Sequence, residues 1–559
     1  MNLLRVPSHL LLILFVISPY SLAQEATPSP GAAEIQASAR VIGAEFSDEQ
    51  VDLMLGQVRQ NLRSYERLRS IPLDNSVVPA LYFLPLGEAP LVAEATRGIE
   101  HGSLSFQRLA GESTVKRPEA LEELAFASIP ELSSLIHSRS VSCVELSEMF
   151  LARLARLDET LHCVIEMTGD RALAQAKLLD QELEQGNSRG ILHGIPWVAK
   201  DLLAVRGTHT TWGAEPFKGQ VIETDASVAR LLEEQGAVLI AKVTLGALAW
   251  GDVWFGGMTR NPWNPEQGSS GSSAGPASAV AAGGAPFGIG SETLGSIISP
   301  STRCGNSSLR PTFGRVSRHG AMTLSWSMDK LGPICRSATD CAIVLDAIHG
   351  RDELDPTTST RAFDPAPKER EGEGFTVGFL EGAFDRGGEP NRYAHVLEEL
   401  EAMGAELVPF SMPDYPTGDM TFILSAEAAT AFDEFSASGR ADGMVRQTGD
   451  AWPNVFRLAR LIPAVDYLRA NRLRTLLTQE LEAALSDLDA VVHPSFAGGV
   501  LSATNLSGHP TFVAPCGFNE DGTPFSISFT AKLFGETSLL QLARRWQAST
   551  AHHLAHPDL

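Results

Sequence analysis

The sequence predicts an α/β protein in which helices cover the faces of a β-sheet, preceded by a helical N-terminal arm. The prediction depends on helical patterns that end at a glycine and lead directly into short apolar strands. Residues 228–235 form one such helix, Gly236 ends it, and 237–241 is the strand that follows. Of the 559 residues, 43% are hydrophobic and 20% charged, which is ordinary globular composition with enough apolar side chains for a large core.

The first residues are typical of a secretory signal peptide. Arg5 gives a positive start, 10–17 is an apolar run, and Ser21 and Ala23 are small residues placed for cleavage. The run is shorter than the roughly 20 apolar residues that span a bilayer, so a membrane anchor or a buried helix is the less favoured alternative. We expect residues 1–23 to be removed and the protein to be exported, periplasmic or secreted, without a stable membrane anchor.

Residues 24–118 are expected to form an N-terminal extension with a helical arm. Residues 24–45 are rich in Ala, Ser, Pro and Gln, as in flexible segments. Ser47 and Gln50 form a capping box that opens a helix. Its predicted buried face consists of Val51, Met54, Leu55, Val58, Leu62 and Tyr65. Residues 71–118 are expected to pack on the main domain.

Residues 119–545 are expected to form the main domain and 546–559 a C-terminal tail. The predicted helices are 130–137, 143–157 with Ser142 as cap, and 171–184 with Gly186 as stop; the predicted strands are 195–199, 375–380, 405–410, 489–492 and 511–514. A polar, acidic linker is expected around 351–373. The tail carries His552, His553 and His556, which we attribute to a frayed polar end rather than to a metal site.

Charge and cysteine content exclude some classes of function. The formal net charge is −23, and such an acidic protein repels nucleic-acid phosphates. The six cysteines show neither a CxxC pair nor zinc-ligand spacing. Most are expected to be small buried hydrophobic residues, although the sequence leaves open whether any form disulfides.

Residues 268–315 are unusually rich in glycine and serine. A flexible linker would not need the apolar residues threaded through this segment, which are Val280, Phe287, Ile289, Leu294, Ile297 and Ile298. A buried, tightly turning backbone would need them, with glycine where side chains do not fit. The segment is therefore the best candidate for an active site.

Three general catalytic motifs fit it poorly. A phosphate-binding P-loop requires Gly-Lys-Ser/Thr, which the segment lacks. Residues 271–275 match Gly-x-Ser-x-Gly, but the nucleophile elbow should follow an apolar strand, and 264–268 is polar. Ser-x-x-Lys occurs at 113–116 and 327–330 without the Lys-Thr-Gly partner of the penicillin-binding proteins.

The chain resembles the amidase signature family over about 119–545. The matching motifs are Gly194-Ile195-Pro196-Trp197-Val198-Ala199-Lys200-Asp201, Asn261-Pro262-Trp263, Ser270-Gly271-Ser272-Ser273-Ala274-Gly275, Gly288-Ile289-Gly290, Leu294-Gly295-Ser296-Ile297, Cys304-Gly305 and Arg310-Pro311-Thr312-Phe313-Gly314-Arg315. The resemblance implies a large mixed, mostly parallel central sheet with helices on both faces. It also implies cleavage of a carboxylic amide without cofactor or metal, acting on a small-molecule or peptide amide.

The same resemblance implies the roles of individual residues. Ser296 would be the nucleophile and Lys200 the base. Ser272 would be the proton relay between them, and the family holds this serine through a cis peptide bond. A lysine is a base only when neutral, and burial in the apolar strand before it would lower its pKa. The backbone N–H groups of Thr293, Leu294, Gly295 and Ser296 would form the oxyanion hole.

Three positions depart from the family pattern. Glu292 replaces an aspartate, Leu294 a glycine, and Ile298 the usual arginine, so the charged pair behind the nucleophile is missing or rewired.

Two other functions stay open. One is the glutaminase subunit of a tRNA-dependent amidotransferase, which the acidic charge and the signal peptide oppose; the other is a non-enzymatic scaffold, which retention of the three catalytic residues opposes. Substrate identity and oligomeric state are not predicted.

Overall fold

The computed structural model describes residues 29–81, 104–110, 115–368, 374–386 and 389–559. The predicted signal peptide, residues 1–23, lies outside the described residues. Within them, no helix is long and apolar enough to cross a membrane.

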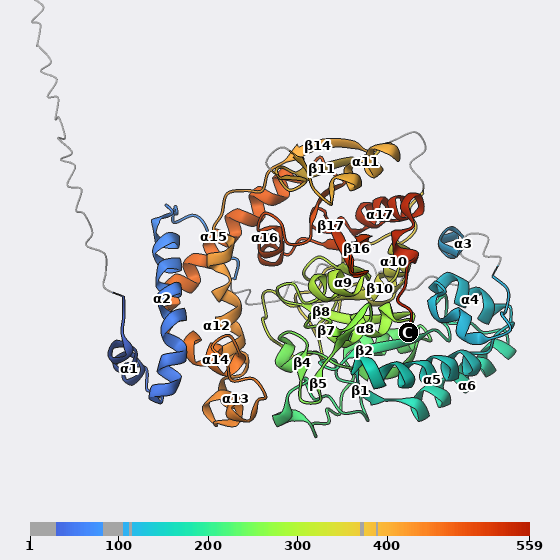
Figure 1. Ribbon diagram of the computed structural model, residues 1–559, viewed down its shortest axis with the longest axis horizontal. Helices are drawn as coiled ribbons and strands as arrows, with labels where there is room; N and C mark the ends of the chain where they lie inside the picture. Colours follow the sequence, from blue (N-terminus) through green and yellow to red (C-terminus); the bar gives the residue numbers. More distant parts are fainter. Residues whose placement is uncertain (1–28, 82–103, 111–114, 369–373, 387–388) are drawn as a thin grey trace, which may run out of the picture.

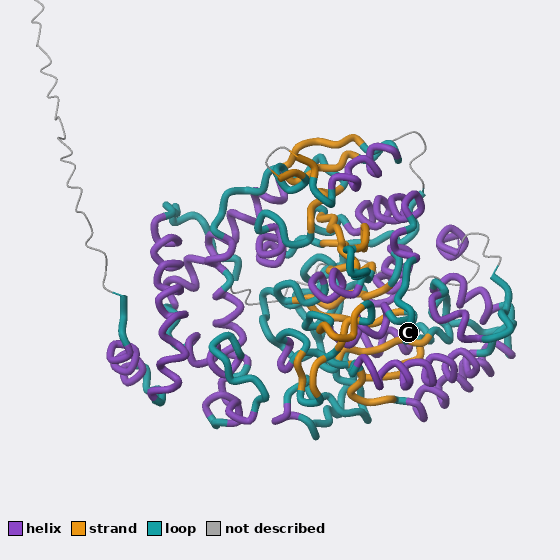
Figure 2. Tube along the Cα trace, in the orientation of Figure 1, coloured by secondary structure: helices purple, strands orange, loops and turns teal. Residues whose placement is uncertain are grey.

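A single eleven-stranded sheet forms the centre of the molecule, in the order β1-β3-β2-β8-β10-β9-β16-β17-β15-β11-β14 (Figures 1 and 2). Its strands are β1 (Val164–Met167), β2 (Pro196–Lys200), β3 (Val238–Val243), β8 (Phe287–Glu292), β9 (Ser307–Arg310), β10 (Lys330–Cys335), β11 (Thr376–Leu380), β14 (Glu406–Phe410), β15 (Ala490–Pro494), β16 (Thr511–Phe518) and β17 (Pro524–Thr530). Shorter strands, β4 (Val253–Trp254), β5 (Gly257–Met258), β6 (Arg260–Asn261), β7 (Asn264–Gly268), β12 (Asp385–Arg386) and β13 (Glu389–Pro390), form two-stranded ribbons. The predicted mixed sheet is confirmed.

The prediction that the sheet is mostly parallel is wrong. Only the pairs β2–β3, β2–β8, β11–β15 and β11–β14 are parallel; the other neighbouring pairs are antiparallel. The reason is that a strand from later in the chain lies between two strands that would otherwise be parallel neighbours. Strands β8 and β9 run in the same direction on either side of β10, and β15 and β16 do so on either side of β17. The helix between two strands could be predicted from the sequence, but the later strand that separates them could not.

Helices flank this sheet, and α1 and α2 form a separate layer together with the later helices α12–α15, at the left in Figure 1. The α-helices are α1 (Ala32–Val41), α2 (Asp48–Ser70), α3 (Leu104–Ala110), α4 (Ile129–His137), α5 (Cys143–Leu161), α6 (Gly169–Glu184), α7 (Ser227–Glu234), α8 (Ala274–Ala281), α9 (Ile298–Cys304), α10 (Ala338–Ile348), α11 (Ala394–Ala402), α12 (Phe422–Ala431), α13 (Asp433–Ala437), α14 (Trp452–Ala459), α15 (Ala464–Ala484), α16 (Val500–Ser507) and α17 (Glu536–Thr550). The short 3-10 helices are Leu121–Phe126, Glu215–Phe217, Ala247–Ala249, Thr417–Met420, Arg440–Gly443 and His552–Leu554. Every helix and strand predicted within 119–545 is present, with ends within a few residues.

The helix predicted after Ser47 is present as α2, but the expectation that residues 24–45 are flexible is wrong, because this range contains helix α1. Ser47 caps α2, and its hydroxyl accepts from the Gln50 N–H at 3.2 Å, closing the predicted capping box. Helix α2 contacts α14 and α15. One predicted core position differs, because Leu62 is 36% exposed while Leu68 is fully buried. The strip of α2 that faces the protein is therefore narrower than its apolar pattern.

The C-terminal tail is not frayed, which corrects the prediction for its histidines. Helix α17 continues to Thr550, and a 3-10 turn over His552–Leu554 follows it. His552 Nε2 lies 2.8 Å from Glu399 Oε1 on α11, and the His556 ring stacks on Phe126 with centroids 3.9 Å apart. Polar composition predicted a loose end, but ring stacking and a hydrogen bond hold it on the domain.

All six cysteines are buried and free, and burial was the expectation for most of them. The structure pairs none of them in a disulfide, and burial raises the pKa of Cys304, Cys335 and Cys516. Buried thiols of this kind are unreactive packing groups.

Candidate active site

Lys200 lies at the end of β2, deep in the sheet. Strand β2 runs between β3 and β8, which buries all five of its residues. The rings of Trp197 and Phe287 stack across the β2–β8 pair with centroids 6.2 Å apart. Burial lowers the pKa of Lys200 well below its ordinary value, against the opposing charges of Asp329 and Glu292. The predicted neutral base is therefore placed where it can be neutral.

A second buried lysine on the neighbouring strand shows what distinguishes Lys200. Lys242 on β3 forms an ion pair of 2.7 Å with Asp201. The partners of Lys200 are instead hydroxyl groups and one carbonyl. A buried carboxylate favours an ammonium group, whereas hydroxyls compensate its desolvation only weakly. The two lysines therefore differ in their electrostatic surroundings although both are fully buried.

Three serine hydroxyls surround the amine of Lys200. The Nζ atom lies 2.9 Å from Ser272 Oγ, 3.0 Å from Ser273 Oγ and 2.8 Å from Ser291 Oγ. The peptide bond between Gly271 and Ser272 is cis, as the resemblance implied. The structure thus brings two of the three predicted catalytic residues into hydrogen-bond contact.

Counting protons around this amine narrows the possible roles of the serines. A neutral amine donates two hydrogens and accepts one. Ser273 donates its hydroxyl hydrogen to the Ser291 carbonyl at 3.1 Å and accepts from the Ser291 N–H, so it must also accept from Lys200. The lone pair of Lys200 is then left for the hydroxyl of Ser272 or Ser291. Ser273 is accordingly an anchor for the amine rather than a proton relay.

Ser296 lies between β8 and α9, beside this cluster. Its carbonyl accepts from the Ser273 N–H at 3.0 Å, which joins the loop of the predicted nucleophile to the loop of the predicted relay. Ser296 is half-buried, whereas Lys200 and Ser272 are 0% and 1% exposed. A substrate could therefore reach residue 296 while the base stays shielded from water.

The charged pair behind the predicted nucleophile, Ser296, is rewired rather than missing. Glu292 forms a buried ion pair of 2.8 Å with Arg310 on β9, and its other oxygen accepts from the N–H groups of Ile297 and Ile298 at 2.8 and 2.9 Å. Burial opposes ionisation of Glu292, but Arg310 and these hydrogen bonds outweigh it and lower its pKa to about 2. The longer glutamate thus reaches an arginine on another strand, and its carboxylate fixes the backbone directly after Ser296.

Asp329 accepts a hydrogen bond from a residue of the predicted oxyanion hole. One of its oxygens accepts from Thr293 Oγ1 at 2.6 Å, and the other accepts from the N–H groups of Leu324 and Ser325 at 2.8 Å each. Burial raises the pKa of Asp329, and these three hydrogen bonds counter the rise. Asp329 therefore ties Thr293, the first predicted oxyanion residue, to the loop before β10.

A cavity of about 390 Å³ opens beside these groups. Ser291, Thr293 and Asp329 are among its lining residues, and residues 354–357 of the expected acidic linker form part of its wall. A second cavity of about 430 Å³ shares Met322, Thr323 and Trp326 with the first. Its walls are largely aromatic: Trp212, Phe217, Trp326, Phe432 and Phe435. The first cavity thus contains polar groups where it meets Ser291, and the second is mainly aromatic.

The structure disfavours the alternative catalytic motifs. Ser327 Oγ donates to Glu427 Oε1 at 2.7 Å, while the amine of Lys330 is bonded to the Met328 carbonyl, so this Ser-x-x-Lys pair is engaged elsewhere. The other pair begins at Ser113, outside the described residues. The polar strand before Ser272, β7, belongs to a two-stranded ribbon and not to the central sheet, unlike the strand of a nucleophile elbow.

Four groups at the site were not singled out from the sequence: Ser273 and Ser291 around Lys200, Arg310 behind Glu292, and Asp329 under Thr293. Ser291 stands directly before Glu292 at the end of a predicted buried segment, which was the one available signal. Arg310 reaches the site from β9 and Asp329 from the loop before β10, and only the tertiary structure shows these contacts.

Comparison with known proteins identifies the class. The Amidase family model matches residues 145–500. The A subunit of glutamyl-tRNA(Gln) amidotransferase from Thermosynechococcus vestitus is 31% identical over 77% of this chain and 99% of its own length, and that from Moorella thermoacetica is 32% identical over 78% and 99%. The solved structure of the native peptide amidase of Stenotrophomonas maltophilia superposes with a TM-score of 0.70 at 30% identity, covering 78% of this chain and 99% of the other.

These matches cover most of the chain and nearly all of each relative. The chain belongs to the amidase signature family and is an enzyme acting on carbon–nitrogen bonds.

Proposed function

We propose that the protein hydrolyses a carboxylic amide through an acyl-enzyme on Ser296, with Ser272 as proton relay and Lys200 as base. The observation that carries this proposal is the fully buried amine of Lys200, held 2.9 Å from Ser272 Oγ among hydroxyl partners. A serine hydroxyl needs a base to become an effective nucleophile, and an amide nitrogen needs a proton to leave.

In the proposed sequence, Lys200 accepts the proton of Ser272 while Ser272 accepts that of Ser296. The Ser296 oxygen then forms a bond to the amide carbon, and the backbone N–H groups of residues 293–296 stabilise the negative oxygen. The proton returns through Ser272 to the leaving amine as the carbon–nitrogen bond breaks. Water, deprotonated through the same relay, attacks the acyl-enzyme and releases the acid and Ser296.

The cavity favours amides that carry an apolar group. The polar end near Ser291 and Thr293 suits the amide, and the aromatic walls around Trp326 and Phe432 suit an aryl or branched alkyl group. A small-molecule amide and the amidated end of a peptide both meet this description.

The second candidate is the glutaminase subunit of a tRNA-dependent amidotransferase. The similarity to the A subunits of two such enzymes favours it. The net charge of −23 opposes work on tRNA, and so does the proposed export. Purification from its own cells tests this alternative: amidotransferase partners bound to a protein with an intact N-terminus would support it over the amidase.

We also propose that the protein is exported after cleavage near Ala23, on the strength of the apolar run 10–17 and the small residues that follow. N-terminal sequencing of protein from the periplasmic and culture fractions tests this. A chain that begins at Gln24 outside the cytoplasm supports export, and one that begins at Met1 in the cytosol contradicts it.

Covalent labelling tests the nucleophile. A fluorophosphonate should label the purified protein, and Ser296→Ala should abolish labelling. Ser299→Ala is the matched control, because Ser299 lies one helical turn away and its hydroxyl bonds to Ser270 Oγ at 2.8 Å. Equal labelling of Ser296→Ala and wild type would refute the assignment. Ammonia release from a panel of amides, with and without aromatic groups, then identifies the substrate class.

A further inference from the structure

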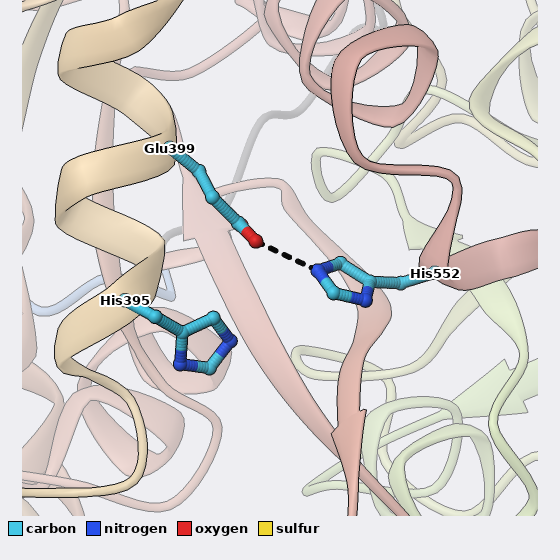
Figure 3. Close-up of side chains that lie close together, drawn as sticks. All are labelled: His395, Glu399 and His552. Carbon is cyan, nitrogen blue, oxygen red and sulfur yellow. Dashed lines mark hydrogen bonds and ion pairs between the residues drawn. The ribbon is translucent and has the colours of Figure 1, made fainter.

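Three potential metal ligands meet where the C-terminal segment crosses α11. They are His395 and Glu399 of α11 and His552 after α17 (Figure 3). Residues four apart lie on one face of a helix, so α11 presents two ligands to the third. One ligand atom from each residue lies within 4.8 Å of the other two. Among the residues described, no other group of histidine, cysteine and acidic side chains meets this criterion.

Neighbouring groups hold these side chains in position. Trp546 Nε1 donates to Glu399 Oε2 at 2.9 Å, which leaves Oε1 facing His552 Nε2 at 2.8 Å. His395 Nε2 lies 2.7 Å from the Cys516 carbonyl of β16. The bond from Trp546 to Glu399 is of the kind that commonly orients the ligands of metal sites. Glu399 and His552 are 22% and 24% exposed, so an ion can enter from solvent.

We propose that His395, Glu399 and His552 bind a zinc ion that fastens the C-terminal segment to α11. Two imidazoles and one carboxylate form a ligand set that zinc accepts in proteins. Ligands around tetrahedral zinc lie about 3.4 Å apart. Glu399 Oε1 and His552 Nε2, now 2.8 Å apart, would therefore separate slightly when the ion binds, and His395 would shift to complete the site. Ligation through His395 Nε2 would replace its hydrogen bond and leave the Cys516 carbonyl beside the ion. This proposal is independent of the amide chemistry.

The site would join parts of the chain that are distant in sequence. Helices α11 and α17 lie beside each other near the β11–β14 edge of the sheet (Figure 1), and His552 follows α17 directly. Glu399 and His552 are already joined by a hydrogen bond. Zinc would connect the same two residues through metal–ligand bonds. Because the ion binds the folded chain and not the unfolded one, it raises thermal stability.

Calorimetric titration of the untagged, EDTA-treated full chain with zinc chloride tests the proposal. We expect one zinc ion per chain and a rise in the unfolding temperature, with no rise from magnesium or calcium. His395→Ala and His552→Ala should each weaken zinc binding at least about tenfold. His209→Ala is the matched control, since His209 is an exposed histidine paired with a glutamate elsewhere on the surface, and it should bind zinc like the wild type.

Glu399→Gln keeps the size of the side chain and serves if an alanine variant fails to fold, as judged by circular dichroism. It should also weaken zinc binding at least about tenfold. The proposal is overturned if the wild-type chain shows neither binding heat nor a stability shift at about 1 mM zinc. It is equally overturned if folded variants at positions 395, 399 and 552 bind zinc as tightly as the wild type.

Discussion

Replacing Lys200 with methionine should nearly abolish amide hydrolysis while leaving the protein folded. Methionine has almost the length of lysine, so it fills the space at the end of β2 without the amine. The hydroxyls of Ser272, Ser273 and Ser291 each lose a partner at 2.8 to 3.0 Å. The base of the proposed mechanism is removed without a large cavity.

The expected loss follows from the role assigned to the amine. A positioned acid–base group contributes about 10²- to 10⁴-fold to the rate, so the activation barrier should rise by about 3 to 5 kcal/mol. Stability should change much less. Three hydroxyls each lose a hydrogen bond worth about 1 kcal/mol, but the cost of burying an amine disappears. These two effects on the free energy of unfolding oppose each other.

The pH dependence supplies a second measurement. Because the pKa of Lys200 is lowered in the folded state, the unfolded chain binds an extra proton between that pKa and about 10.4. Wild-type stability should therefore rise with pH across this window, and Lys200→Met should lack that contribution. Wild-type kcat should rise with pH through the folded pKa of Lys200, because only the neutral amine accepts a proton.

The assay is ammonia release over a pH series, together with urea unfolding of both proteins. The matched control is Lys218→Met, which removes a half-exposed lysine whose nearest charged partner, Glu215, is 3.8 Å away. It should leave kcat and the pH profile unchanged. A folded Lys200→Met enzyme with turnover near that of the wild type would refute the assignment of the base.

Three further substitutions test the surrounding groups. Ser291→Ala should lower kcat about tenfold, because Lys200 loses its partner at 2.8 Å but keeps Ser272. If Ser291→Ala lowers kcat as much as Ser272→Ala does in the same steady-state assay, Ser291 is itself a proton relay. Asp329→Asn should lower kcat by about 10- to 100-fold and change KM less. The NH₂ of the new amide cannot accept a hydrogen bond, yet it must face either the Thr293 hydroxyl or the two backbone N–H groups that the carboxylate accepts from. Unchanged kinetics would contradict a role of Asp329 in holding Thr293. Glu292→Gln should lower the free energy of unfolding, measured in urea at pH 7, by about 3 kcal/mol. The reason is that a carboxyl with a folded pKa of about 2 stabilises the protein above about pH 4.3 and loses this effect as the pH falls toward 2. A difference between the two proteins that does not change with pH would refute this linkage.

Part of the site could be predicted from the sequence because its residues lie in long local motifs. Lys200 ends an apolar strand, and Ser272 and Ser296 stand in a segment whose glycines mark a tightly turning backbone. The partners of these residues could not be predicted in this way. Arg310 reaches Glu292 from β9 and Asp329 reaches Thr293 from the loop before β10, and neither contact leaves a local pattern. The rewired pair could be recognised as a departure at positions 292 and 298, but its new partner could not.

By itself, the sequence determined the local elements of this protein: the capped helices and the apolar strands. Each depends on side chains within about ten residues of one another, and periodicity and capping report such short-range interactions. Only the tertiary structure decided that β10 and β17 separate strands running in the same direction, that Ser273 and Ser291 enclose the amine of Lys200, and that His552 contacts α11. These features arise from packing between segments far apart in the chain, where the burial of many side chains together outweighs any local preference.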